Sequence, residues 1–593
     1  MSVEPLAAEA VLVAEFGRTM TRAFLVDRVD GAYRFLARGE AISTQEPPHD
    51  DLTVGLQAAV QQIEYVAGRK LLKRDRLMLP QAANGDGVDA FLAVANCGDP
   101  WRLAILDAGA GQGEVAAIAE VTRRMETLVY TITPPGRGMR PHDWLAQHST
   151  ALATWRPDTL VLLTGPAPNP ETVGRMIALI KGLAGPAAAT LSALDQARAQ
   201  VPVLAVTTDA VYNQLVDQLA TRTNLRHIAE PTPAALADRL ANELTRLIDD
   251  QAADRIHGYE TVSSWSAAPV MRRQKAAGLV TQYLARSGQR RVGLVDLDEA
   301  VGVYVAAPDR LSGAVVADVD LAMGLPNLLS QTSANALRRW LPFELAEAEL
   351  AHWAINRALR PLTVPVTLRD QLIEQAFARE AIHLAMGRLP AGTGAGVELL
   401  IGSQWLGRWR GPAAAAPVLL DGVLPAPESG AVTLALDLTG VLPAMGALAQ
   451  VQAAAAAAVV EHDALLPLGT CLVVQGGHDG QRAVSGVIQR AGGDTNQFEV
   501  KAGSIVALPL GLNEPASIRL TLDGRATLGG FRAGQTVQFE APTHVRGGAV
   551  GLIIDARGRP LLLPDDARRR QERLREWLAA FGLLPAAGDA TGD

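Results

Sequence analysis

Short apolar runs and helix-like repeats alternate along the first part of the chain. Apolar residues dominate 11–16, 22–27 and 33–38, and a tight turn joins the first two runs, so we predict three strands of one sheet there. Between residues 51 and 69 the apolar side chains recur at helical spacing, at Val54, Leu56, Ala59, Val60, Ile63, Val66 and Ala67. The pattern therefore predicts a small sheet followed by an amphipathic helix.

The middle of the chain alternates strands with helices. Residues 101–109, 159–183 and 201–220 each begin with an apolar strand that enters a turn, and the latter two continue into a helix. A further strand pair is predicted at 292–297 and 301–306, and residues 331–390 are largely helical in pattern. This alternation is typical of an α/β sheet. The Ala-rich run at 447–460 is broken by two glutamines and indicates a helix rather than a membrane span.

The pattern changes near residue 464, where short β-rich runs separated by Gly, Pro and Asp begin. We expect its last two runs, before and after residues 556–559, to form a hairpin. The predicted organisation is a first α/β lobe with an insertion, a second lobe with a helical subdomain, a β-rich module and a terminal helix, spanning 9–289, 290–463, 464–564 and 565–582.

The composition of the chain excludes some classes of function. The chain has 593 residues and a formal net charge of −8, which disfavours general nucleic-acid binding because counterion release needs a basic surface. Cys97 and Cys471 are far apart, so neither a disulfide framework nor a cysteine zinc site is expected. The first residues lack the basic segment of a signal peptide, and no apolar run is long enough to span a bilayer. We therefore expect a cytoplasmic protein with no membrane span.

The first turn carries the chemistry that a phosphate needs. In "VAEFGRTMTR", Gly17 would let backbone N–H groups approach an anion, and Thr19 and Thr21 would add hydroxyl donors. An ordinary β-turn explains the same residues. No Walker A motif is present, because "GAGQGEV" lacks the terminal Gly-Lys-Ser/Thr, and His142 and His148 do not have the spacing of a helical zinc pair.

Several longer segments extend this motif into a family resemblance. "LVAEFGRTMTRAFLVD", "VADVDLAMGLPNLL", "WLPFELAEAELAHWAINRALRPLTVPVT", "LLIGSQWLGRW" and "VRGGAVGLIIDARGRPLLLP" resemble the glutamate mutase L group, which comprises methylaspartate mutase accessory proteins. That group lies within the actin/Hsp70/sugar-kinase superfamily. The resemblance implies two actin-like (ribonuclease H-like) α/β lobes with ATP and magnesium between them, and a chaperone-like service to a coenzyme-B12-dependent mutase.

The sequence departs from the family pattern at each nucleotide loop. In the first loop, Glu15 stands where the family has Asp and Arg18 replaces a small Ser, while Gly17, Thr19 and Thr21 match.

The second loop, "DLDEAVGV", keeps Asp296 but has Asp298 and Glu299 where the family has two glycines. Like charges about 4 Å apart repel by about 4 kcal/mol at an effective dielectric of 20, so these acids oppose a polyphosphate. Because carboxylates also bind cations, the three acids form a candidate metal cluster. We expect a solvated acidic turn instead.

In the third loop, Gly402 and Ser403 match, but Gln404 and Trp405 replace the glycines that would admit adenine. We predict Trp405 to be a packed aromatic residue.

The leading hypothesis is an accessory or assembly protein with a degraded nucleotide site, no catalytic residues, no bound cofactor or metal, and a protein partner such as a mutase subunit. One alternative is an active ATPase that reactivates a B12-dependent mutase and uses ATP and magnesium. A second is an actin-like cytoskeletal or envelope-assembly scaffold, because fold alone does not decide among such functions.

Overall fold

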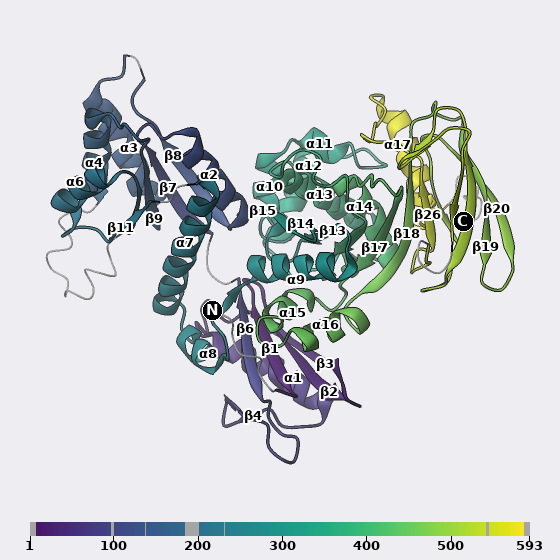
Figure 1. The fold of residues 1–593 in the computed structure, drawn as a ribbon, viewed down its shortest axis with the longest axis horizontal. Coiled ribbons are helices and arrows are strands. Elements are labelled where there is room, and N and C mark those ends of the chain that lie inside the picture. The colour runs from purple at the N-terminus through teal and green to yellow at the C-terminus, as the bar shows by residue number, and fades with distance from the viewer. Residues whose placement is uncertain are drawn as a thin grey trace. The chain divides into compact units, whose positions relative to one another are not determined.

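The computed structural model describes residues 8–96, 100–136, 138–183, 201–229, 232–540 and 545–585. It divides into two compact units, one formed by residues 1–97 with 256–593 and the other by residues 98–255. Many elements of both units are labelled in Figure 1.

The first lobe is a five-stranded sheet in the order β12-β6-β1-β2-β3. Strands β1, β2 and β3 are consecutive antiparallel neighbours, whereas β6 runs parallel to β1. Helix α1 packs against β2 and β3 through Leu56, Ala59, Val60 and Ile63, as the helical spacing predicted, whereas Val54 and Val66 of the predicted stripe are exposed. The bounds are β1 Val11–Phe16, β2 Met20–Val29, β3 Ala32–Ile42, α1 Leu52–Ala67, β6 Ala90–Ala95, α8 Tyr259–Trp265 and β12 Met271–Arg272, with a small β4–β5 hairpin at Leu72–Lys73 and Arg76–Leu77.

The second lobe repeats this strand order. Its sheet begins β15-β14-β13-β16-β17-β18, with β13, β14 and β15 antiparallel and β16 parallel to β13. The bounds of its strands are β13 Val292–Asp296, β14 Val301–Ala307, β15 Arg310–Val316, β16 Leu399–Gly402, β17 Ala431–Leu436 and β18 Leu466–Gln475. Two sheets with the same order confirm the predicted two-lobed α/β fold, including the predicted assignment of 11–38 and 292–306 to different sheets.

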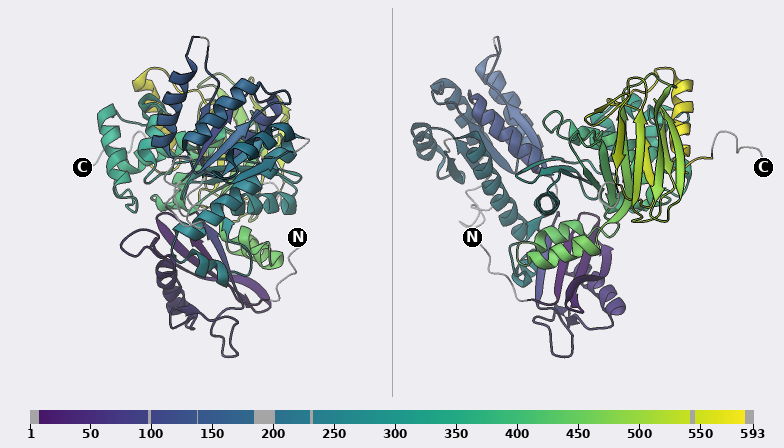
Figure 2. Two further views of the ribbon diagram at one scale, coloured as in Figure 1. Left: turned by 90° about the vertical axis from the view of Figure 1, so that its left-hand side faces the viewer. Right: turned by 45° about the vertical axis from the view of Figure 1, so that its right-hand side comes forward.

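Helices of the second lobe pack on both its own sheet and the first lobe. Helix α9 and the pair α15–α16 contribute side chains to a core shared with β1, β2 and β6. The two turned views in Figure 2 show this helix pair against the first-lobe sheet. The helices are α9 Arg273–Gly288, α10 Leu325–Gln331, α11 Ala334–Arg338, α12 Glu347–Ala358, α13 Leu368–Met386, α14 Ala415–Val423, α15 Leu442–Leu448 and α16 Ala453–His462, with 3-10 turns η2 Gln404–Arg408 and η3 Pro412–Ala414.

The single Ala-rich helix expected at 447–460 is wrong. The segment forms the end of α15 and then α16, with a break at 449–452. The physical reason lies in Gln452, whose side-chain amide donates to the Ala8 carbonyl at 2.9 Å and to the Tyr33 hydroxyl, so it ties the break to the first lobe.

The C-terminal β-rich region is continuous with the second lobe. Strand β18 pairs with β17 of that lobe and also with β26, and Leu468, Cys471, Ile553 and Trp577 belong to the second-lobe core. The strands and helix are β19 Arg482–Arg490, β20 Thr495–Lys501, β21 Ile505–Leu508, β22 Ala516–Leu522, β23 Thr527–Leu528, β24 Phe531–Arg532, β25 Thr536–Phe539, β26 Leu552–Asp555 and α17 Ala567–Ala579. Residue 464 therefore does not mark a break in the sheet.

The hairpin expected around residues 556–559 is also wrong. Strand β26 pairs with β18 and β21 instead, and residues 560–563 form no strand. Two side chains of the turn fold back onto the strand: Arg557 and Arg559 both donate to the buried Asp555 carboxylate, and Arg557 also contacts Asp421 of α14 at 2.8 Å. This buried ion cluster fixes the turn against the second lobe.

The inserted unit is a parallel five-stranded sheet in the order β8-β7-β9-β10-β11. Its bounds are β7 Trp101–Asp107, α2 Gln112–Arg124, β8 Thr127–Ile132, α3 Pro141–Trp155, β9 Thr159–Leu163, α4 Pro170–Leu183, β10 Val203–Val206, α6 Asp209–Leu219, β11 Leu225–Ile228 and α7 Pro233–Arg255. The strand–helix alternation predicted an α/β sheet here, and the structure shows a doubly wound one. No helix in the described ranges combines the length and the apolarity that crossing a bilayer would require.

Candidate functional site

The first predicted loop is the turn between β1 and β2. It is closed by a hydrogen bond from the Gly17 amide to the Met20 carbonyl at 2.9 Å, which leaves the amides of Arg18 and Thr19 directed away from the hairpin ladder. Thr19 lies in the turn, whereas Thr21 is fully buried on β2 and its hydroxyl lies against Gly55 of α1. The fold therefore separates two hydroxyls that the sequence placed together.

Glu299 from the second predicted loop reaches into the first. Its carboxylate accepts hydrogen bonds from the Arg18 amide at 2.9 Å, the Thr19 amide at 3.3 Å and the Thr19 hydroxyl at 2.9 Å. The Arg18 guanidinium in turn donates to the Glu299 carbonyl at 2.6 Å. A Cβ atom added at Gly17 would overlap this carboxylate, so the glycine is needed for the close approach. An acidic side chain thus occupies the donors predicted to hold a phosphate.

The other acids of the site converge on one arginine. Arg273, the first residue of α9, donates to both oxygens of Asp296 at 2.9 and 3.0 Å and to Asp298 at 2.9 Å. Arg273 also pairs with Glu15. The Glu15 carboxylate forms a second ion pair with Arg22 at 3.2 Å. The guanidinium therefore stands between three carboxylates from the two lobes.

The whole cluster is buried, which overturns the expectation of a solvated acidic turn. Asp296, Asp298 and Glu299 are each at most 5% exposed, and Glu15 is fully buried. The expectation failed because it did not foresee the cations that face these acids. Burial raises the pKa of Asp296, and the charge of Asp298 adds to this rise while Arg273 opposes it. The surrounding carboxylates hold the pKa of Arg273 well above its ordinary value despite the burial of the guanidinium.

The third predicted loop follows β16. The Ser403 amide donates to the Val295 carbonyl at 2.9 Å, and its hydroxyl accepts from the Leu297 amide at 3.1 Å, so Gly402 and Ser403 support the second loop from the neighbouring strand. Gln404 accepts a hydrogen bond from Arg38 of the first lobe at 2.8 Å.

Trp405 is a packed residue, as predicted. It is 5% exposed, and its indole N–H donates to the buried Glu374 carboxylate at 3.0 Å. The Arg408 guanidinium lies 4.2 Å from its ring centroid. The indole is therefore engaged within the second lobe.

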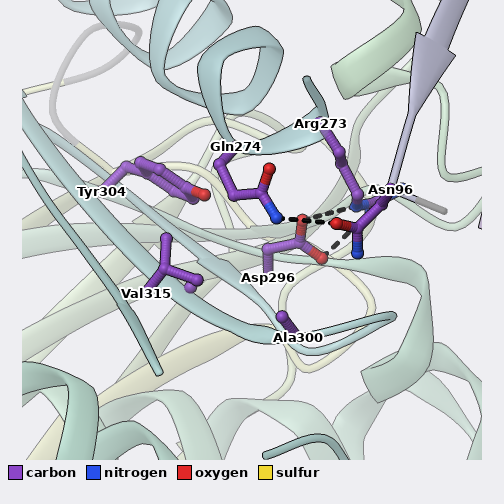
Figure 3. Close-up of a pocket in the computed structure, with 8 residues that line it drawn as sticks. Asn96, Arg273, Gln274, Asp296, Ala300, Tyr304 and Val315 are labelled. Carbon is purple, nitrogen blue, oxygen red and sulfur yellow. Dashed lines mark hydrogen bonds and ion pairs between the residues drawn. The ribbon is translucent and has the colours of Figure 1, made fainter. Parts of the chain in front are cut away.

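A small pocket lies beside the arginine cluster. It has about 190 Å³ of empty space, open solvent included, and Gly302 is one of its lining residues. Figure 3 labels the other lining residues, which are Asn96, Arg273, Gln274, Asp296, Ala300, Tyr304 and Val315. Within it, the Gln274 amide donates to Asn96 at 2.8 Å. The pocket is small beside the sites of drug-sized ligands, which usually measure about 300–1,000 Å³.

The arrangement does not fit ATP with magnesium. The first-loop donors are satisfied by Glu299, and Arg273 stands where a cation bound by Asp296, Asp298 and Glu15 would have to lie. Among the described residues, no group of three His, Cys, Asp or Glu side chains is placed to hold a metal ion.

Sequence reasoning missed Arg22 and Arg273. Arg273 follows another arginine at the start of a helix, where a positive charge opposes the helix dipole. In the sequence, this unfavourable position of a positive charge was the one indication that Arg273 has an acidic partner.

Comparison with known proteins supports the fold group. The model of the family described as "MutL protein" matches residues 295–464, less than a third of the chain, and includes the second and third loops. No curated protein matches. Together with the repeated strand order, the match supports membership of the actin/Hsp70/sugar-kinase superfamily.

The solved structures that this chain resembles share little sequence identity with it. A carbohydrate kinase from Novosphingobium aromaticivorans is 13% identical with a TM-score of 0.28, over 78% of this chain and 94% of the kinase. A glycerol dehydratase reactivase is 10% identical with a TM-score of 0.23, over 66% of this chain and 92% of the reactivase. A Ppx/GppA family member from Aquifex aeolicus is 9% identical with a TM-score of 0.16, over 67% and 66%. Because these TM-scores are below 0.5, the fold assignment rests on the strand order of the two sheets.

Proposed function

We propose that this chain is a glutamate mutase L-like accessory protein whose two lobes are held together by its own side chains instead of by a nucleotide. The observation that carries the proposal is the Glu299 carboxylate in the first loop, where three donors bind it within 3.3 Å. A backbone turn that is already saturated by an internal anion has no free donors for a phosphate.

The ion cluster around Arg273 strengthens this proposal. Glu15 belongs to the first lobe and Asp296 to the second, and one guanidinium bridges them in the buried interior. Breaking a buried pair leaves an uncompensated charge, which costs about 3–5 kcal/mol, so the bridge resists separation of the lobes. A nucleotide would have to displace both Glu299 and Arg273 to enter.

The partner is proposed to be a subunit of a coenzyme-B12-dependent mutase in the cytoplasm. The family match over residues 295–464 supports a relationship to the accessory family.

The active reactivating ATPase is the second candidate. One observation favours it: Glu15 and Asp298 each keep one buried oxygen with no hydrogen-bond partner among the described residues. Carboxylate oxygens are the ligands that a hydrated magnesium ion takes, but Arg273 would first have to move aside.

A pull-down with the full chain from native cytosol tests the proposal in two arms. In one arm apyrase removes nucleotide, and in the other magnesium-ATP is added at millimolar concentration. Equal recovery of a mutase subunit in both arms is expected. Release of the mutase only with ATP would support the ATPase, and recovery of no mutase subunit would overturn the accessory assignment.

A further inference from the structure

The end of α12 and the loop that follows it expose a run of aliphatic side chains. Leu359 and Val366 are each 76% exposed, and Ile355, Val364 and Leu362 are 49%, 46% and 42% exposed. Ile355 and Leu359 are four residues apart and share a helix face. We call residues 355–366 the aliphatic loop; in Figure 1, α12 lies on the side of the second lobe away from the first-lobe sheet. Exposed apolar clusters of this kind usually mark interaction sites.

The backbone of the aliphatic loop is held by hydrogen bonds from two arginines, the largely buried Arg357 and the exposed Arg410. The largely buried Arg357 donates to the carbonyls of Arg360 and Pro361, each at 3.3 Å, and to the Thr363 hydroxyl at 2.6 Å. Arg410 donates to the Val366 carbonyl at 3.1 Å. These bonds fix the backbone while the aliphatic side chains remain exposed. A preorganised apolar surface loses less conformational entropy when it binds.

The charge that is left unpaired around the aliphatic loop is positive. Arg357 pairs with the buried Glu374, and Arg369 pairs with Glu349, so these two arginines are already neutralised. Arg360 within the loop and Arg410 beside it have no acidic partner among the described residues. This local excess of arginine contrasts with the formal net charge of −8 for the chain. Two copies of such a surface would repel each other, so a self-complementary contact is disfavoured.

We infer that the aliphatic loop is a docking surface for another protein, whose matching surface is an apolar groove rimmed by carboxylates. Leu359 and Val366 enter the groove, and Arg360 faces the acidic rim. Arginine beside apolar anchors is a common composition of protein interfaces, and complementary charge sets the orientation of the encounter. This inference concerns a different surface from the ion cluster between the lobes.

Site-specific photocrosslinking in the native cells provides the test. The photoreactive residue p-benzoylphenylalanine replaces Leu359 in the full chain and, as a matched control, Leu562, which is 78% exposed. We expect one protein adduct from position 359 that is absent from position 562. That protein is then purified and titrated against the unmodified chain.

Matched variants decide whether the adduct reports docking. Leu359→Ser with Val366→Ser should weaken binding at least tenfold, whereas Val66→Ser with Leu562→Ser, which removes comparable exposed apolar surface, should change it less than twofold. Arg360→Glu should weaken binding most at low salt, because screening reduces its contribution as salt rises. Equal melting temperatures exclude misfolding of the variants.

Four results would overturn the inference. The first three are no protein adduct at position 359, equal adducts at positions 359 and 562, and an adduct with a second copy of this chain. The fourth is that the chain binds phosphatidylglycerol vesicles and that Leu359→Ser abolishes this binding.

Discussion

Replacement of Glu299 by alanine should both loosen the first loop and weaken the contact between the lobes. Glu299 lies in the second lobe and accepts three hydrogen bonds from Arg18 and Thr19 of the first. Hydrogen bonds to a charged group contribute about 1.5–3 kcal/mol each, but the released donors are at the half-buried turn and regain water. We therefore expect a net loss of about 2–4 kcal/mol in the free energy of unfolding of this unit.

Two assays measure this loss of stability. Urea denaturation gives the free energy of unfolding, and hydrogen exchange resolved at the Arg18 and Thr19 amides reports the loop directly. The control is Glu9→Ala, because Glu9 forms an exposed ion pair with Arg28 and such pairs contribute at most about 1 kcal/mol. If Glu299→Ala costs no more than the control and leaves exchange at the two amides unchanged, the carboxylate does not hold the loop and our reasoning fails.

Three further predictions concern the buried charges and the C-terminal region. Arg273→Met should destabilise the chain by about 3–5 kcal/mol near pH 8 and by less near pH 5, because the abandoned carboxylates take up protons in the folded state; urea titrations at the two pH values test the sign. Asp437 accepts a hydrogen bond from the Leu442 amide at the start of α15, and burial raises its pKa to about 6. The folded state therefore binds the proton more tightly than the unfolded state. The stability that this proton binding adds is fully present below about pH 4 and is lost as the pH rises through 6. Relative to Asp437→Asn, the wild-type free energy of unfolding should fall by roughly 2–3 kcal/mol between pH 4 and pH 7.5, and parallel profiles would contradict this. Truncation after residue 463 should yield an aggregated second lobe, because it removes β18 from the sheet; a monomeric, cooperatively melting fragment by light scattering and calorimetry would refute this continuity.

Periodicity was sufficient to predict much of the fold. The strands at 11–16 and 292–296 are short apolar runs, and helix α1 has apolar residues at helical spacing; both are local signals, and the structure confirms these elements. The continuity of β18 with β17 could not be predicted, because it depends on pairing between strands and the local composition changes near residue 464. The turn at 556–559 was misjudged for a similar reason: Asp421, its partner, is more than a hundred residues away.

The candidate site was predicted only in part. The sequence identified Gly17, Thr19 and Glu299 as loop residues, but it could not show that Glu299 enters the first loop from 280 residues away. It also treated the acids at 296–299 as exposed, because the counter-charge of Arg273 comes from a different element. Long-range charge pairing leaves little local signal, except for a basic residue at a helix start such as Arg273.

Calorimetric titration of the purified wild-type chain with magnesium-ATP tests the central claim most directly. We predict no binding heat up to millimolar nucleotide, because Glu299 saturates the loop donors and Arg273 fills the space between the carboxylates. In Glu299→Ala the loop donors are free, and weak binding of ATP or inorganic phosphate is expected to become measurable. A dissociation constant for the wild-type chain below about 100 μM, equivalent to about 5.5 kcal/mol of binding free energy, would contradict the account and identify the cleft as a working nucleotide site.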